Sequence, residues 1–261
     1  MLPIKKIYID SRYKSSDSRS HSDFSIDLPQ TFLMPEDTGF YIDDVCIPHS
    51  WYPIERNVNN YIIVAIDTQQ LAIELDPGMY TVQDLNTHIV AKMNGRITGN
   101  KFSSSWNQKE NTIGINIASG STVSIPTDSE ITDPLYKSRN INHILKNYTS
   151  GKTYNSSNPF KSGQVDLNPL RNIYMSASGL GNFNTITVSG NRNVVKKIPV
   201  NAPHGSIIFD QTVTGMDYID CSHQTLSRIS FQLRDVFGNL IDLHDNHISF
   251  SIVFSRVQDG S

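Results

Sequence analysis

The stretch that decides the fold is "HISFSIVFSRV", residues 247–257, taken together with "RISFQLRD" at 228–235. Apolar side chains occupy every second position, at Ile229, Phe231 and Leu233 in one stretch and at Ile248, Phe250, Ile252 and Phe254 in the other. Successive side chains of a strand point to opposite faces, so a period of two indicates a strand with one buried face. We therefore predict that these stretches are neighbours in the core of a β-sandwich.

The same period recurs near the N-terminal end. "DFSIDL" at 23–28 places its apolar residues on one face, and "GFYIDDVCIPHSWYPI" at 39–54 predicts a strand that ends near Pro48. "NYIIVAID" and "QLAIELD" predict a hairpin with its turn at 67–69. Strands near both ends of the chain predict a sandwich that is closed by its first and last segments.

One passage in this first half reads clearly as a helix, "TVQDLNTHIVAKMNG" at 81–95. Thr81 suits the N-cap, and Asn94-Gly95 predicts the end. The apolar residues Val82, Leu85, Ile89 and Met93 recur at intervals of three and four, as on one face of a helix. Three short strands over 101–127 and a second helical region over 129–146, interrupted at Pro134, are expected to follow. We place this α+β insertion at roughly 79–165, within a domain that spans 22–261.

The first 21 residues differ from the rest in charge. They carry a net charge of +3, and residues 22–80 contain ten acidic residues and one basic residue. The basic residues of the leader are Lys5, Lys6, Arg12, Lys14 and Arg19. The polar run "SRYKSSDSRSHSD" at 11–23 is typical of an extended segment. We predict an N-terminal arm over 1–21 that contacts a neighbouring subunit, an acidic surface or nucleic acid; a tail without a role is the alternative.

The composition limits the class of protein. Of the 261 residues, 38% are hydrophobic and 18% charged, and the net charge of -3 gives no general argument for nucleic-acid binding. Cys46 and Cys221 lie far apart in the sequence and indicate no disulfide framework. The longest apolar run, "YIIVAI" at 61–66, is far too short to cross a bilayer. We expect a soluble protein with no membrane span, folded in a reducing compartment.

The candidate catalytic patterns are weak. Asp37-Thr38-Gly39 is the triplet of aspartic proteases, but the hydrophobic strand and the second aspartate that such a site needs are not evident. His244 and His247 are three apart, a metal-ligand spacing for a helix, but they stand where a strand begins. We therefore predict no catalytic residue, no metal site and no cofactor.

Four passages resemble one family when they are taken in order. They are residues 7–29, 39–54 and 77–89, and "LSRISFQLRDVFGNLIDLHDNHISFSIVF" at 226–254. Their sequence is similar to the minor capsid, or penton, proteins of Maverick/Polinton elements, virophages and the related adenovirus-like mobile viruses. The resemblance is weakest over 95–205.

The resemblance implies a fold and a role. The fold class is all-β, a single jelly-roll β-sandwich with an inserted α+β region, an architecture common in viral capsids. The role is a structural penton subunit that forms homopentamers at icosahedral vertices and contacts a double-jelly-roll major capsid protein. Such a protein is located in the virion, is assembled inside the host cell, and is placed to contact packaged DNA through its arm. The alternatives are a trimeric jelly-roll module that binds a receptor or glycan and, third, an enzyme of the cupin or glycosidase kind.

Overall fold

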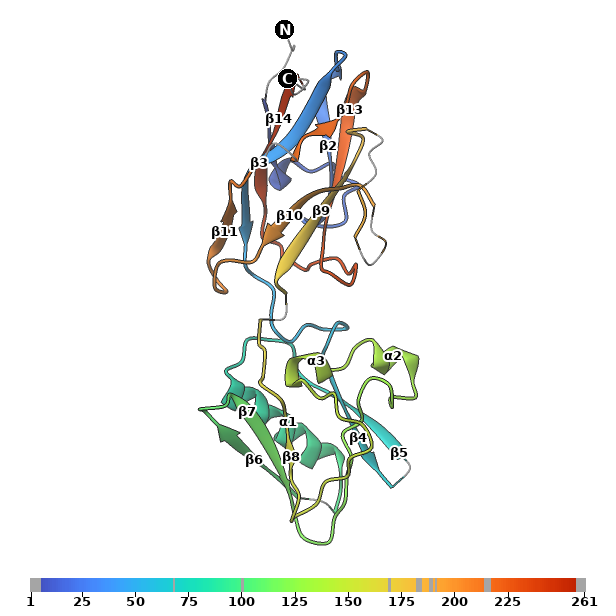
Figure 1. Ribbon diagram of the computed structural model, residues 1–261, viewed down its shortest axis with the longest axis vertical. Coiled ribbons are helices and arrows are strands. Elements are labelled where there is room, and N and C mark those ends of the chain that lie inside the picture. Colours follow the sequence, from blue (N-terminus) through green and yellow to red (C-terminus); the bar gives the residue numbers. More distant parts are fainter. Residues whose placement is uncertain are drawn as a thin grey trace, which may run out of the picture. The chain divides into compact units, whose positions relative to one another are not determined.

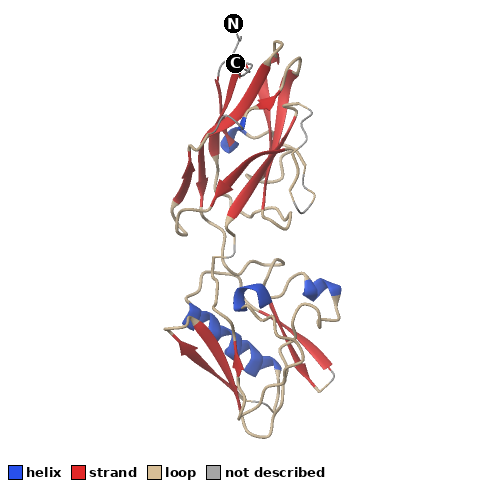
Figure 2. Cartoon of the chain, viewed as in Figure 1, coloured by secondary structure: helices blue, strands red, loops and turns tan. Residues whose placement is uncertain are grey.

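The chain forms two compact units, Met1–Trp51 with Leu170–Ser261, and Tyr52–Pro169. The computed structural model describes residues 6–67, 69–99, 101–168, 170–181, 185–187, 190, 192–213 and 217–256. Strands dominate the first unit, and the α-helices of the described residues belong to the second (Figure 2). Each unit has its own cluster of buried apolar side chains, so each has its own core.

The first unit is a sandwich of two antiparallel sheets (Figure 1). The first sheet has the order β1 (Lys6–Asp10), β14 (Ser249–Arg256), β3 (Thr38–Pro48) and β11 (Ile207–Asp210), and β12 (Ile219–Asp220) also pairs with β3. The second sheet has the order β10 (Val194–Pro199), β9 (Asn172–Ser178), β13 (Thr225–Arg234) and β2 (Asp23–Leu33).

The strand order is that of a jelly roll. The first strand, β1, pairs with the last strand, β14. The second strand, β2, pairs with the last but one, β13. β3 lies on the other side of β14, and β9 on the other side of β13. A chain whose ends are paired inward in this way is rolled up from both termini into two facing sheets. The predicted fold class is confirmed.

Aromatic residues from both sheets meet in the core. The ring of Phe231 on β13 lies 4.8 Å from that of Phe250 on β14 and 5.5 Å from that of Phe24 on β2. Phe40 and Phe254, which lie in the first sheet, are 6.3 Å apart. β13 and β14 are therefore neighbours in the core, as predicted, but they pack face to face and do not share hydrogen bonds.

A bulge in β3 keeps its apolar residues on the core side. Cys46 pairs with Ser249 and Asp43 with Ser251, so β3 contains one residue more than β14 between these two pairs. Asp44 lies at the bulge and has a positive φ of 52°. Beyond the bulge Val45 faces the core, as Ile42 does before it.

Residues 6–21 are not the free arm predicted for residues 1–21, because they are part of the sandwich. In β1, Ile9 is buried beside Phe250, and Ile7 is packed at the margin of the core. The following residues stay close to the sheets, since Ser11 N donates to Ile248 O at 2.9 Å and Ser15 N donates to Ser25 O at 2.8 Å. The two isoleucines of "IYI" supply the apolar surface that a short strand needs at a sheet edge.

The second unit is an α+β structure built around one helix (Figure 1). Its elements are β4 (Tyr61–Ile66), β5 (Gln69–Glu74), α1 (Val82–Arg96), β6 (Phe102–Asn107), β7 (Thr112–Ile117), α2 (Pro134–Lys137), α3 (Asn142–Leu145) and β8 (Phe160–Lys161). β4 and β5 form the predicted hairpin, and β6, β7 and β8 form a second sheet. The segment 122–127 was expected to be a strand, but it makes only isolated bridges, at Val123 and Ser124.

The helix α1 agrees closely with its prediction. The Thr81 side chain accepts from Asp84 N at 3.1 Å, which caps the first turn. Leu85, Ile89 and Met93 are fully buried. The helix continues slightly beyond the predicted end, to Arg96.

The unit boundaries differ from the predicted insertion at 79–165. The second unit begins at Tyr52 and ends at Pro169, so it includes the β4–β5 hairpin. Ile62, Val64 and Ile73 of that hairpin belong to the same buried cluster as the apolar face of α1. Alternating apolar residues predicted the hairpin but did not show which of the two cores it would join.

We expect Ile9→Ala to lower the free energy of unfolding of the sandwich by about 2–5 kcal/mol, because the substitution leaves a cavity beside Phe250. Tyr8→Ala is the matched control on the same strand, since this side chain is 78% exposed, and it should change stability by less than about 0.5 kcal/mol. Urea denaturation of both variants measures the difference. Equal effects would mean that β1 does not contribute to the core.

We expect Leu85→Ala to destabilise the second unit by about 2–5 kcal/mol, because the leucine is fully buried under α1. Gln83→Ala, at an exposed position of the same helix, is the control and should unfold like the unchanged protein. Thermal unfolding followed by circular dichroism compares the two. Identical curves would contradict the assignment of the buried face.

Candidate interaction surface

The outer face of the first sheet exposes large apolar side chains. We define this face by Tyr8 on β1, Tyr41 on β3, Val253 on β14, and Ile207 and Phe209 on β11. Tyr8 is 78% exposed, Ile207 64% and Phe209 48%. These residues alternate with the core-facing ones, so the sheet has apolar residues on both faces.

The strand register places small residues in the middle of this face. Phe209 lies beside Cys46, which lies beside Ser249, and Ser251 separates Tyr8 from Asp43. The larger side chains of β1 and β11 therefore stand on the two edge strands, and serines of β14 lie between them. A partner that binds this face would therefore immobilise few flexible side chains, and little side-chain entropy would be lost.

The charged side chains on this face are paired within the chain, with Lys6 between two aspartates. Lys6 Nζ lies 2.6 Å from Asp44 and 3.3 Å from Asp43, and Gln211 donates to Asp44 at 2.9 Å. The hydrogen bond from Lys6 is the main reason that the pKa of Asp44 lies below its ordinary value. A face with paired charges and exposed aromatic residues has the character of the centre of a protein interface.

The outer face of the second sheet is different in character. Ser25 and Ser230 are hydrogen-bonded at 2.7 Å, and Gln232 donates to Asp23 at 3.0 Å. Arg228 Nη2 donates to both carboxylate oxygens of Asp17, at 2.7 and 2.6 Å. These groups satisfy one another, so this face resembles an ordinary solvated surface. The first sheet therefore offers the better candidate for contact with another protein.

The structure does not gather the predicted arm residues into one basic patch. Lys5 lies outside the described residues. Lys6 pairs with the acidic residues of β3, Arg12 pairs with Asp10 at 2.6 Å, and Arg19 lies 3.6 Å from Asp23. Lys14 is half-buried at the end of the short 3-10 helix η1 (Ser11–Tyr13). Contacts of these residues with other molecules stay a prediction.

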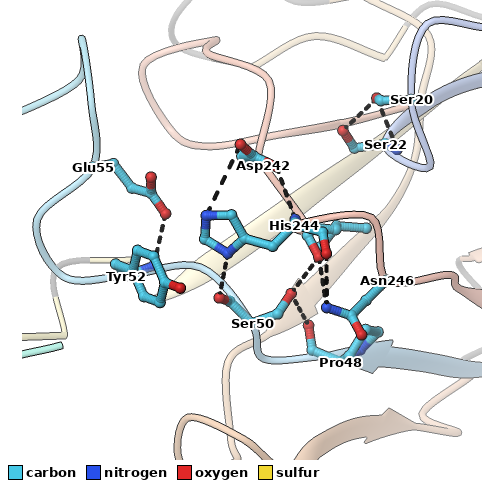
Figure 3. A network of polar contacts seen from close by, with 10 residues as sticks. Ser20, Ser22, Pro48, Ser50, Tyr52, Glu55, Asp242, His244 and Asn246 are labelled. Carbon is cyan, nitrogen blue, oxygen red and sulfur yellow. Dashed lines mark hydrogen bonds and ion pairs between the residues drawn. The ribbon is translucent and has the colours of Figure 1, made fainter. Parts of the chain in front are cut away.

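His244 and His247, the pair considered as a metal site, have different surroundings. His244 Nδ1 lies 2.7 Å from the Ser50 carbonyl oxygen, and Ser50 Oγ donates to Leu243 O at 2.8 Å (Figure 3). This network fastens the loop after β13 to the end of β3, whereas His247 is exposed. Among the described residues no group of three or more His, Cys, Asp or Glu side chains is arranged to hold a metal ion.

The other chemical candidates have structural positions. Asp37 has a φ of 57° in the turn before β3, and Thr38 Oγ1 donates to Pro35 O at 2.8 Å. Cys221 N donates to Thr38 O, which places Cys221 eight residues along β3 from Cys46, roughly 25 Å away. That separation is too long for a disulfide. Burial raises the pKa of the Cys221 thiol to about 12.

Comparisons with known proteins agree with this architecture. No family model matches the sequence, and no curated protein matches it. The fold resembles that of the mavirus penton protein. The crystal structure of that selenomethionine-labelled protein matches with a TM-score of 0.55 and 12% identity, and the match covers 97% of this chain and 100% of the other. It therefore includes residues of both compact units. Within the described residues no helix is long and apolar enough to cross a membrane.

Sequence reasoning did not find the interaction surface. The outward positions of β3 and β14 are mostly polar, and β11 has only four residues. A weak signal for an apolar outer face was present in "SIIFD" at 206–210. Its three central residues are all apolar, so a strand here would have apolar side chains on both faces.

A buried histidine at the end of β3 predicts acid sensitivity. His49 is buried, stacked on Trp51 at 4.2 Å, with Nδ1 2.8 Å from Ala202 O. Burial, with a smaller contribution from the charge of His204, lowers the pKa of His49 below its ordinary value of 6.5. The unfolded chain therefore binds the proton more readily, and the stability that this histidine contributes is present above about pH 6.5 and is lost as the pH falls through the lower pKa of the folded state.

We expect the free energy of unfolding to fall as the pH decreases from about 7, and the fall to be smaller in His49→Gln. Other histidines whose pKa is lowered by burial, such as His143, will keep part of the dependence. The exposed His247→Gln variant is the control. An unchanged pH slope in His49→Gln would contradict this assignment.

Proposed function

We propose that the protein is a structural capsid protein of the penton type. The observation that carries the proposal is the match to the mavirus penton protein, which covers nearly all of both chains and includes the second unit as well as the jelly roll. The resemblance of the four sequence passages points independently to the same group.

The proposed assembly is a homopentamer at the vertices of an icosahedral shell. A ring with fivefold symmetry joins two different patches of each subunit, because the contact is head to tail. The outer face of the first sheet is our candidate for one of these patches, since Ile207, Phe209 and Tyr8 are apolar and exposed, and Lys6 on the same face is paired with acidic residues of β3. A standard interface buries about 800 Å² on each partner.

The remaining parts of the proposal follow from the same role. The rim of the pentamer would contact a double-jelly-roll major capsid protein, and the protein would be located in the virion after assembly in the host cell. We propose no enzymatic activity. Contact of the basic residues of 6–21 with packaged DNA stays part of the proposal, although Lys6, Arg12 and Arg19 are each close to a carboxylate of the same chain, which weakens their attraction for phosphate.

The mass of the particle in solution tests the proposal. Native mass spectrometry should show a species of five times 29.3 kDa. A trimer would instead support the receptor- or glycan-binding module considered as the alternative. A protein that stays monomeric at high concentration, both alone and with a major capsid protein, would contradict the penton role.

We expect Phe209→Asp to weaken pentamer formation by at least about tenfold, because a carboxylate in the centre of an apolar contact must lose its hydration. Leu135→Asp introduces the same charge at an exposed apolar position of the second unit and serves as the control. Thermal unfolding verifies that both variants are folded. If Phe209→Asp assembles as the unchanged protein does, this face is not the subunit contact.

A further inference from the structure

A shallow depression of about 520 Å³ opens on the second unit, between the last turns of α1 and the β4–β5 hairpin. Its base is made by small residues, including Ala72, Ala91 and Gly95. A Cβ atom placed on Gly95 would meet nothing within 4 Å, so the space above the helix is open. The volume lies in the range of small-molecule sites, and the small side chains in part of the lining leave this space open.

One wall of the depression is aromatic and held firmly by the backbone. The rings of Tyr61 and Tyr136 are 5.0 Å apart at 56°. Tyr61 N donates to Arg139 O at 3.1 Å, and Ile141 N donates to Tyr61 O at 2.8 Å. Asn140 Nδ2 donates to Tyr136 O at 3.3 Å. The backbone that carries the two rings is therefore fixed by hydrogen bonds.

The other polar groups have complementary chemistry. Glu74 lies directly opposite Tyr61 in the hairpin and also lines the depression, and its Oε1 accepts a hydrogen bond from Asn60 Nδ2 at 3.2 Å. Lys92 is held by Asp76 at 2.8 Å. Arg96, in the last turn of α1, is exposed and makes no ion pair with the part of the chain that the structure describes. Its guanidinium is a fixed fork of donors that suits a carboxylate.

We propose that this depression binds a sugar that carries a carboxylate group. The apolar C–H face of a pyranose ring fits against Tyr61 and Tyr136, because aromatic rings offer large contact area with few rotatable bonds. Glu74 accepts hydrogen bonds from the sugar hydroxyls, and Arg96 pairs with the sugar carboxylate in a charge-assisted contact. A polyphosphate is disfavoured, since Glu74 repels it and Arg96 is the one lining cation whose charge is not neutralised in the described structure.

The inference does not depend on the capsid role. The lining residues all belong to the second unit, whereas the proposed subunit contact lies on the first sheet of the jelly roll. Failure to bind sugar would therefore leave the penton proposal untouched, and failure to form pentamers would leave the sugar site untouched.

Saturation-transfer difference NMR on the full chain tests the site. The acidic probes are the methyl glycosides of N-acetylneuraminic acid and of glucuronic acid, and methyl galactoside is the neutral comparison. We expect saturable binding of at least one acidic probe with a Kd in the millimolar range, and at least about tenfold weaker binding of the neutral sugar. Absence of saturable binding for both acidic probes, or equal binding of the neutral sugar, would overturn the proposal.

Variants separate the two walls of the site. Arg96→Gln should weaken binding of the acidic probe about tenfold, because it removes the charge and leaves a shorter polar side chain. Tyr136→Ala should weaken binding to a similar extent, whereas Tyr136→Phe, which keeps the ring, should retain most of it. Lys152→Gln removes a positive charge from a loop of the same unit outside the depression and should bind like the unchanged protein. If Lys152→Gln weakens binding as much as Arg96→Gln does, the attraction is general and the assigned site is wrong.

Discussion

The pairing of the first strand with the last is the constraint on which the sandwich depends. β1 supplies Ile9 to the core and pairs with the edge of β14. Phe250, Ile252 and Phe254 of β14 belong to the same core, between the two sheets. Antiparallel pairing over Lys6–Asp10 fixes the register of β14, and β14 in turn pairs with β3. A strand of five residues can do this because tertiary contacts, and not its own length, stabilise it.

The same roll explains how the protein carries a second core. The chain leaves the sandwich after β3 and returns to it before β9, at two strands that lie in opposite sheets. His49, Ser50 and His244 fasten the departing segment to neighbouring loops of the sandwich. Because the second unit has its own buried cluster around α1, its surface can change without disturbing the pairing of the sheets.

This division allows the two proposed activities to occupy different parts of the chain. Assembly requires a broad face with exposed apolar side chains, and the outer face of the first sheet has this property. Recognition of a small ligand requires a depression with a few convergent polar groups, and these stand on α1, the β4–β5 hairpin and α2.

The sequence by itself determined the elements whose signals are local. The alternation in β13 and β14 and the capped, periodic stripe of α1 are complete within about 15 residues, so the strands, the helix and the class of fold could be predicted. Tertiary structure alone decided the rest. Residues 6–10 are a strand because β14 is beside them, the bulge at Asp44 exists because β3 must keep register with β14, and the hairpin at Tyr61 joins the second core because α1 covers it. The depression between Tyr136 and Arg96 joins residues that are distant in sequence. Such contacts depend on the pairing of segments far apart in the chain, and no local pattern of residue types encodes which partner a segment will meet.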